Sequence, residues 1–240
     1  FAPPWETGPA VRAAGEKALL LDAGLSEAHL SLAVALGFQE RRWGDAEAAY
    51  RRALELDPNY ATGHHWFAFF LQILGRFDEA LDERRRALEI DPMTPMLGVG
   101  LADLYVAMRR PDRAIDTVEP ILERYPRFWF ARLARGQALE QMGRHHEALQ
   151  DFLEAERATP DNFQVMASVA GALAATGYTR KARRRVLEAE RLARSTYVPA
   201  FDLGLMRIAL GDLDQAFDWL RRSCDIKEIR LNAIGFHQGV

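Results

Sequence analysis

The stretch GRFDEALDERRRALEIDP, residues 75–92, decides the fold, because related versions of it recur along the chain. Two of these are GDAEAAYRRALELDP (44–58) and GRHHEALQDFLEAERATP (143–160). Each begins with a glycine, carries apolar residues at helical spacing, and ends in a proline. These shared features indicate that one helical element is used several times.

A fixed interval of 34 residues relates the copies. The closing prolines follow this interval, at Pro58, Pro92, Pro126 and Pro160. A small residue follows it as well, at Ala46, Ala80, Ala114, Ala148, Ala182 and Ala216. Such a period indicates a repeat architecture, in which each unit buries its apolar face against the next unit.

Small residues mark two further places in most units. The early series is Val34, Ala68, Ala102, Gly136, Ala170 and Gly204, and the late series is Ala53, Ala87, Ala155, Ala189 and Ser223, with Ile121 in the third unit. Two antiparallel helices approach closely only where their crossing points carry small side chains. The sequence therefore predicts a tight helix pair in each unit, with the turn at glycines such as Gly75 and Gly143.

The predicted elements are helices only. The expected pairs are 26–39 with 43–56, 60–74 with 77–90, 94–108 with 111–124, 128–142 with 145–158, 162–176 with 179–193, and 197–210 with 213–227.

This pattern resembles the tetratricopeptide repeat (TPR) over residues 27–228. The resemblance implies an all-α fold, a right-handed superhelix (α-solenoid) of about six helix-turn-helix repeats, starting near residues 27, 61, 95, 129, 163 and 197. A half-repeat over 9–22 precedes them. We expect one domain over 1–240, in which residues 228–240 cap the last pair, because the ends of solenoids need covering.

A narrower resemblance concerns residues 55–92, which contain the phrase NYATGHHWFAFF. This stretch, with RRWGDAEAAY (41–50) and residues 197–220, is similar to TPR arrays at the C-terminal end of bacterial multidomain signalling proteins. There the array follows a winged-helix, adenylate cyclase or Ser/Thr kinase domain. The resemblance implies a regulatory or scaffolding part of a larger signalling or transcription-regulatory protein, and it transfers no activity.

The composition bounds the possible functions. The 240 residues carry a net charge of −3, so no global field favours nucleic acid or membrane surfaces. The one cysteine, Cys224, excludes an intramolecular disulfide and a cysteine-based zinc site. No apolar run approaches the roughly 18–20 residues of a membrane span. We expect a cytoplasmic protein without nucleic-acid or membrane partners.

The resemblance places an apolar and aromatic groove on the concave face, where it would bind a protein or peptide segment. Its predicted members are Phe38, His65, Trp66, Phe69, Asp103, Phe130, Leu133 and Gln137. The Lys/Asn/Arg set of carboxylate-clamping TPR domains is absent, since the matching places hold Ser31, Ala35, Trp66, Phe130 and Ala134. The alternative is that these rings pack within the fold itself.

Arg132 and Arg135 break the local rule, because they stand within a first helix at places that are usually apolar in the repeat. We expect an ion pair, with Glu140 or Asp103 as the partner. The alternative is an anion site.

No catalytic, cofactor or metal motif emerges, so we predict no enzyme activity. Adjacent histidines such as His64 and His65 point about 100° apart on a helix and cannot share one ion. Two other hypotheses stay open at this point. One is a structural element that forms homo-oligomers through its terminal repeats, and the other is a small-molecule sensor in the groove.

Overall fold

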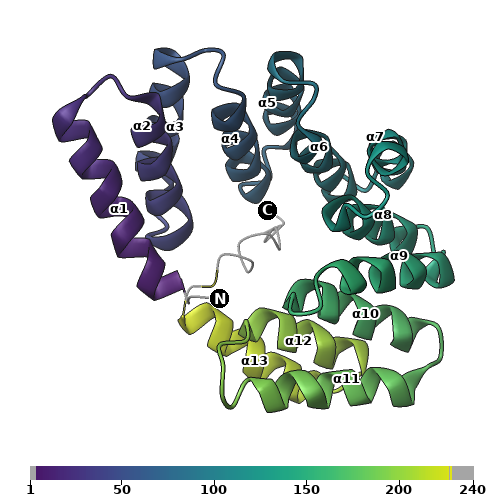
Figure 1. Ribbon diagram of the computed structural model, residues 1–240. Coiled ribbons are helices and arrows are strands. Elements are labelled where there is room, and N and C mark those ends of the chain that lie inside the picture. The colour runs from purple at the N-terminus through teal and green to yellow at the C-terminus, as the bar shows by residue number, and fades with distance from the viewer. Residues whose placement is uncertain (1–3, 227, 229–240) are drawn as a thin grey trace, which may run out of the picture. The chain divides into compact units, whose positions relative to one another are not determined.

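The computed structural model describes residues 4–226 and 228, which form helices joined by short turns (Figure 1). No strand occurs among these residues. Every predicted helix is present, with ends within about three residues of the expected ones. The two helices of repeats one, two, four, five and six pack against each other as pairs. The all-α solenoid class is therefore confirmed.

Two compact units divide the described residues, one holding 4–100 with Glu228 and the other holding 101–226. The boundary falls inside α6 (Pro95–Ala107), the first helix of the third repeat. A single domain over 1–240 stays a prediction, because each unit is compact by itself. The predicted cap over 228–240 lies outside the described residues, apart from Glu228.

The first unit contains the half-repeat and the first two helix pairs, which Figure 1 draws from purple to blue. Its elements before α6 are α1 (Pro4–Leu21), α2 (Ser26–Val34), the π-helix η1 (Ala35–Gln39), α3 (Trp43–Leu56), α4 (Ala61–Ile73) and α5 (Phe77–Ile90). α1 contains the half-repeat helix expected over 9–22, although it begins earlier, at Pro4. The π-turn of η1 extends the first helix of repeat one.

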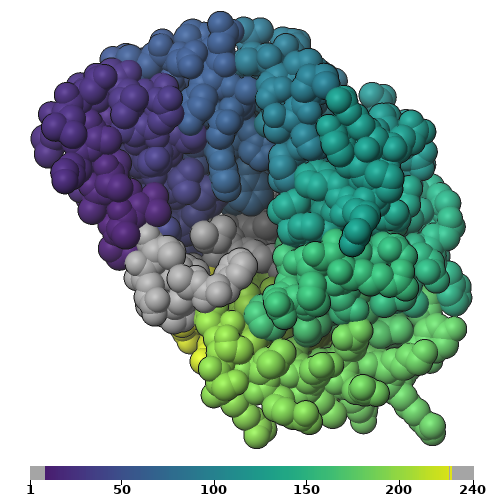
Figure 2. Space-filling view, viewed as in Figure 1, coloured from purple at the N-terminus to yellow at the C-terminus, as the bar shows by residue number. Residues whose placement is uncertain are grey.

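The second unit continues with the remaining pairs. Its elements after α6 are α7 (Pro111–Arg124), α8 (Trp129–Gln141), α9 (His145–Ala158), α10 (Phe163–Ala175), α11 (Thr179–Leu192), α12 (Ala200–Ala209) and α13 (Leu213–Asp225). Figure 2 shows the side chains of successive helices in this unit meeting along the stack, from teal to yellow-green.

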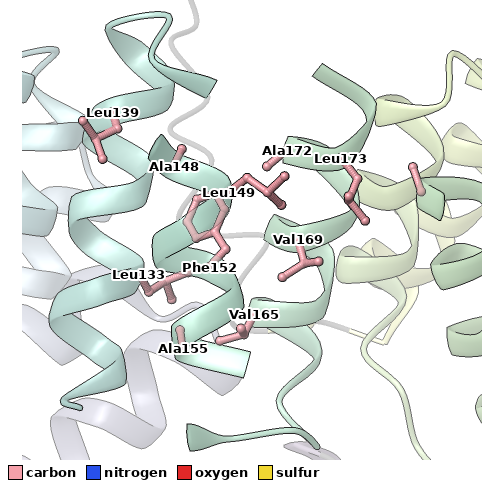
Figure 3. Close-up of a cluster of buried hydrophobic side chains, with 11 residues drawn as sticks. Leu133, Leu139, Ala148, Leu149, Phe152, Ala155, Val165, Val169, Ala172 and Leu173 are labelled. Carbon is pink, nitrogen blue, oxygen red and sulfur yellow. The ribbon is translucent and has the colours of Figure 1, made fainter. Parts of the chain in front are cut away.

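The core of the second unit forms where small and large residues interlock, as Figure 3 shows for α8, α9 and α10. Phe152 is fully buried, and a Cβ at Gly136 would collide with its ring. Ala148 and Ala155 are fully buried on the same helix as Phe152. The glycine and the alanines thus let α8 and α9 approach closely enough to enclose an aromatic ring.

The turn inside each repeat has the same backbone conformation. Six residues at 34-residue spacing have a positive φ: Arg41 (56°), Gly75 (74°), Arg109 (58°), Gly143 (75°), Gly177 (84°) and Gly211 (77°). This left-handed conformation ends the first helix through a bond such as Arg144 N–H to the Leu139 carbonyl, 2.9 Å. The four glycines confirm the sequence prediction, whereas the two arginines adopt the same conformation with a Cβ that disfavours it.

Replacing Arg109 by glycine is expected to stabilise the protein. Arg109 is exposed, so the substitution removes about 1–2 kcal/mol of left-handed strain without opening the core. Urea unfolding should show a higher midpoint for Arg109→Gly. The matched control, Gly143→Ala in the fourth repeat, should unfold at a lower midpoint. An unchanged or lowered midpoint for Arg109→Gly would refute the strain argument.

Candidate functional site

An aromatic cluster lies on the first helices of repeats one and two, within the first unit. The ring of Phe38 lies 6.3 Å from Trp66 and 5.4 Å from Phe69, and Trp66 meets Phe69 edge-on at 6.1 Å. Trp66 is 37% exposed and Phe69 is half-buried, whereas Phe38 is only 1% exposed. The structure thus brings three of the predicted groove residues together, with Phe38 beneath the surface.

Phe38 lies within the π-helix η1 and is buried there. A π-turn inserts one extra residue into a helix. The Glu40 N–H donates to the Ala35 carbonyl, five residues back, at 3.3 Å. Phe38 packs against Trp66 and Phe69, so it supports the aromatic surface and is not free to contact a partner.

The opposite face of α4 belongs to the core. Phe67, Ala68 and Phe70 are buried, and the Tyr50 ring packs against both phenylalanines, with centroids 5.4 and 5.1 Å away. The helix therefore divides into a packing face and a partly exposed face that carries Trp66. The packing role predicted for the small residue Ala68 is confirmed.

His65 flanks the aromatic cluster, with its ring edge-on to Trp66 at 6.0 Å. Arg84 Nη1 donates to His65 Nδ1 at 2.6 Å, which leaves the proton of the imidazole on Nε2. Burial, and then the nearby Arg84 charge, lower the pKa of His65 to about 3. A Cβ at Gly100 would collide with both side chains. His65 is thus neutral and half-buried.

The other four predicted groove residues belong to the second unit. Leu133 is 4% exposed and contributes to the core cluster of Figure 3, so it does not form part of an open surface. Phe130 is half-buried and stacks on Trp129 with ring centroids 3.5 Å apart. Asp103 and Gln137 are also half-buried.

Arg132 and Arg135 each form an ion pair with an acid, but that acid is neither Glu140 nor Asp103. Both arginines bind Asp151 on α9, which is 2% exposed. Arg132 Nη1 donates to Oδ1 at 2.8 Å, while Arg135 Nε and Nη2 donate to Oδ2 and Oδ1 at 2.7 Å each. The expected partners were therefore wrong, because the contact crosses the seam of the helix pair instead of following α8.

The same polar arrangement occurs two repeats earlier, 68 residues back along the chain. His64 Nδ1 donates to Glu83 Oε2 at 2.5 Å, and its Nε2 donates to the Pro58 carbonyl at 3.1 Å. Arg132 likewise donates to Asp151, and through Nε to the Pro126 carbonyl at 3.0 Å. We call this arrangement the seam latch: a cation on the first helix binds the preceding proline carbonyl and an acid on the second helix.

The latch geometry requires a protonated His64, because both ring nitrogens face acceptors. Burial lowers the pKa of His64, but the hydrogen bonds to Glu83 and to the Pro58 carbonyl, with the Glu83 charge, together raise it by more. Arg86, which opposes protonation, contributes least. His64 therefore does in repeat two what Arg132 does in repeat four.

The latch makes a pH-dependent contribution to stability. Because the folded-state pKa of His64 is raised above 6.5, the contribution is complete below pH 6.5 and is lost as the pH rises through the folded value. His64→Arg should remove this loss, since arginine stays charged. Urea unfolding of both proteins between pH 6 and 9 should show that the free energy of unfolding of the wild type falls with pH relative to that of the variant.

The contributions of other titrating groups to the pH dependence of stability cancel when the two proteins are compared. Burial raises the pKa of Glu140 to about 7, and Glu140 is present in both proteins. Parallel unfolding midpoints for the two proteins across this pH range would show that His64 is not the charged member of a latch.

Comparison with known families agrees with this repeat geometry. Two tetratricopeptide repeat models match the sequence, one over residues 49–82 and the other over 99–163. This chain contains tetratricopeptide repeats. No curated protein is detectably similar to it in sequence.

Solved TPR structures share the fold. A tetratricopeptide repeat protein from Parabacteroides merdae superposes with a TM-score of 0.67 at 16% identity, covering 92% of this chain and 89% of its own. PilF of Pseudomonas aeruginosa superposes with a TM-score of 0.59 at 21% identity, covering 82% of this chain and 89% of its own. PilW, described as a widely conserved type IV pilus biogenesis factor, superposes with a TM-score of 0.64 at 21% identity. The match covers 82% of this chain and 91% of the PilW chain. At these identities the likeness concerns the fold alone.

The described residues of the TPR chain show neither a membrane span nor a cluster of metal ligands. No described helix has both the length and the apolar character required to cross a membrane. Nor does the described part bring together three or more metal-ligating side chains.

The seam latches were not evident in the sequence. The acid lies 19 residues after its cation in both latches, at Glu83 after His64 and at Asp151 after Arg132. This spacing spans the turn between two helices. The pairing can therefore be recognised only after each residue has been assigned to its position in the repeat.

Proposed function

We propose that this TPR protein is a protein-interaction module that binds a peptide or protein segment through the aromatic face of α4. The observation that carries the proposal is the exposure of Trp66, at 37%, within a cluster of rings that hold it in place. Large exposed aromatic side chains on a rigid support are frequent anchors of protein interfaces.

The chemistry of this face favours an apolar segment. Trp66 and Phe69 present ring surface, and neutral His65 adds no charge. The face lacks the cationic set that would hold a terminal carboxylate. An amphipathic helix or an extended segment with apolar side chains would complement it.

The wider role rests on the resemblance to the TPR arrays of bacterial signalling proteins. We infer that this chain is the regulatory or scaffolding part of a larger signalling or transcription-regulatory protein. In that role it acts in the cytoplasm and performs no catalysis itself.

Substitution of Trp66 by alanine tests the proposed face. Peptides selected from a random library on the wild-type chain should bind Trp66→Ala at least about tenfold more weakly, since truncating an anchor typically costs about 2 kcal/mol or more. Affinities can be measured by fluorescence anisotropy, with circular dichroism to check the fold. Phe217→Ala, which removes a 64% exposed ring on α13, is the matched control and should bind normally.

Two results would count against the proposal. One is equal affinity of the selected peptides for wild type and Trp66→Ala. The other is a stronger effect of Phe217→Ala than of Trp66→Ala.

A second candidate function is self-association through the terminal repeats. It is favoured by exposed apolar side chains on α13, Leu213 at 54% and Phe217 at 64%, and on α1, Leu20 at 87%. Such side chains would form contacts between two copies of the chain that pair through their terminal repeats. A strict monomer in light scattering at all concentrations would exclude this function and leave the peptide-binding function standing.

A further inference from the structure

A charged cavity of about 290 Å³ opens between α7, α8 and α9 in the second unit. Its lining includes the apolar residues Ile115 and Leu139. Three arginines and three acids also line it: Arg132, Arg135 and Arg144, with Glu119, Glu147 and Asp151. The cavity shares no residue with the aromatic face of α4, so a ligand bound in it is independent of the proposed peptide-binding function.

Arg135, which lines the cavity, replaces an apolar core residue of the repeat. At the equivalent place the other repeats carry only apolar residues, namely Ala33, Phe67, Leu101, Val169 and Leu203. In repeat two the Phe67 ring is 2% exposed and lies under the Arg51 guanidinium, 5.4 Å from the ring centroid. In repeat four a planar cation takes the place of the ring.

Arg135 is not needed to neutralise Asp151. Arg132 already binds Asp151 Oδ1 at 2.8 Å, as His64 binds Glu83 in the other latch. Arg135 adds a second positive charge to the same buried carboxylate, through bonds of 2.7 Å to both oxygens. Arg132 and Arg135 are half-buried, and together they place two positive charges on one buried carboxylate.

Two further acids of the cavity lining, Glu119 and Glu147, form ion pairs with its arginines. The nearest other acid is Glu119, whose side chain is 55% exposed and whose Oε1 lies 3.8 Å from Arg135 Nη1. This separation is too long for a hydrogen bond. The third arginine, Arg144, uses Nε and Nη2 for Glu147, at 2.7 Å each.

One guanidinium nitrogen of each arginine therefore makes no hydrogen bond to the described chain: Arg132 Nη2, Arg135 Nη1 and Arg144 Nη1. Asp151 fixes the orientation of the first two arginines, so the donors are preorganised. Guanidinium donors of this kind recognise carboxylate and phosphate oxygens.

We propose that this cavity binds the carboxylate or phosphate group of a small organic acid. The acid group receives hydrogen bonds from the three arginines, and its carbon skeleton lies on Ile115 and Leu139. A volume near 290 Å³ is at the lower end of the range for ligand sites, which fits a small acid. The replacement of a core side chain by Arg135 then has a functional reason, because an apolar residue would pack there at no electrostatic cost.

NMR titration of the ¹⁵N-labelled chain tests this proposal. The probes are succinate and inorganic phosphate, with uncharged succinamide and sodium chloride at matched ionic strength as ligand controls. At least one of the two anions should cause saturable shifts of amides within residues 115–151, and neither control should. Response to succinate alone assigns a carboxylate, and response to phosphate alone assigns a phosphate group.

Three variants make the test specific. Arg135→Phe restores the residue type of repeat two and should abolish the shifts. Arg144→Gln changes a side chain that is 44% exposed and does not contact Asp151. This variant should bind about tenfold more weakly, the usual loss for one charge-assisted contact. Arg183→Ala removes an exposed arginine of the fifth repeat and should bind within about twofold of wild type.

The proposal is overturned if neither anion gives saturable shifts in the wild-type chain, or if succinamide shifts the same amides equally. It is also overturned if folded Arg135→Phe binds as wild type does. Should Arg135→Phe lose its dispersed spectrum, Arg144→Gln decides: unchanged affinity in that variant refutes the site, and weakened affinity supports it.

Discussion

The close approach of paired helices at small residues is the constraint on which the rest of this structure depends. The alanine that recurs every 34 residues is fully buried from Ala46 through Ala182, and Ala216 is 1% exposed. Opposite it, a glycine such as Gly136 or Gly204 leaves room for a large side chain of the second helix, Phe152 or Leu220. Because the helices meet this closely, every other side chain at the seam must either pack tightly or find a polar partner.

The seam latches are the polar solution to this constraint. In repeats two and four a cation occupies the seam, and it binds both an acid across the pair and the carbonyl of the preceding closing proline. The latch thus links the first helix, the second helix and the loop that enters the repeat. Repeat four adds Arg135 to this arrangement, and Arg135 also lines the charged cavity.

The fold was predictable because its signals are periodic. Small residues, prolines and turn glycines repeat at one interval, and each helix end is marked locally. The left-handed turns at Arg41 and Arg109 were not predictable, because only glycine signals that conformation in a sequence. The repeat frame forces it on the two arginines.

The candidate site was predicted less well, because side-chain burial depends on details within a helix turn. Phe38 was expected on the groove surface, but it is buried within the π-helix η1. Leu133 was also expected on the groove surface, but its side chain is buried in the core cluster of α8, α9 and α10. The ion pair of Arg132 and Arg135 was expected, while its partner Asp151 lies beyond a turn and outside the spacing rules of a single helix.

The most direct test of the central constraint is urea unfolding of Ala148→Val beside Ala158→Val, two identical substitutions on α9. Ala148 is fully buried at the crossing with α8, whereas Ala158 is exposed. Ala148→Val is predicted to lose about 1–3 kcal/mol through overpacking. Ala158→Val should lose only the helix propensity difference, about 0.5 kcal/mol. Equal losses in the two variants would show that the small residues do not set the approach of the helices.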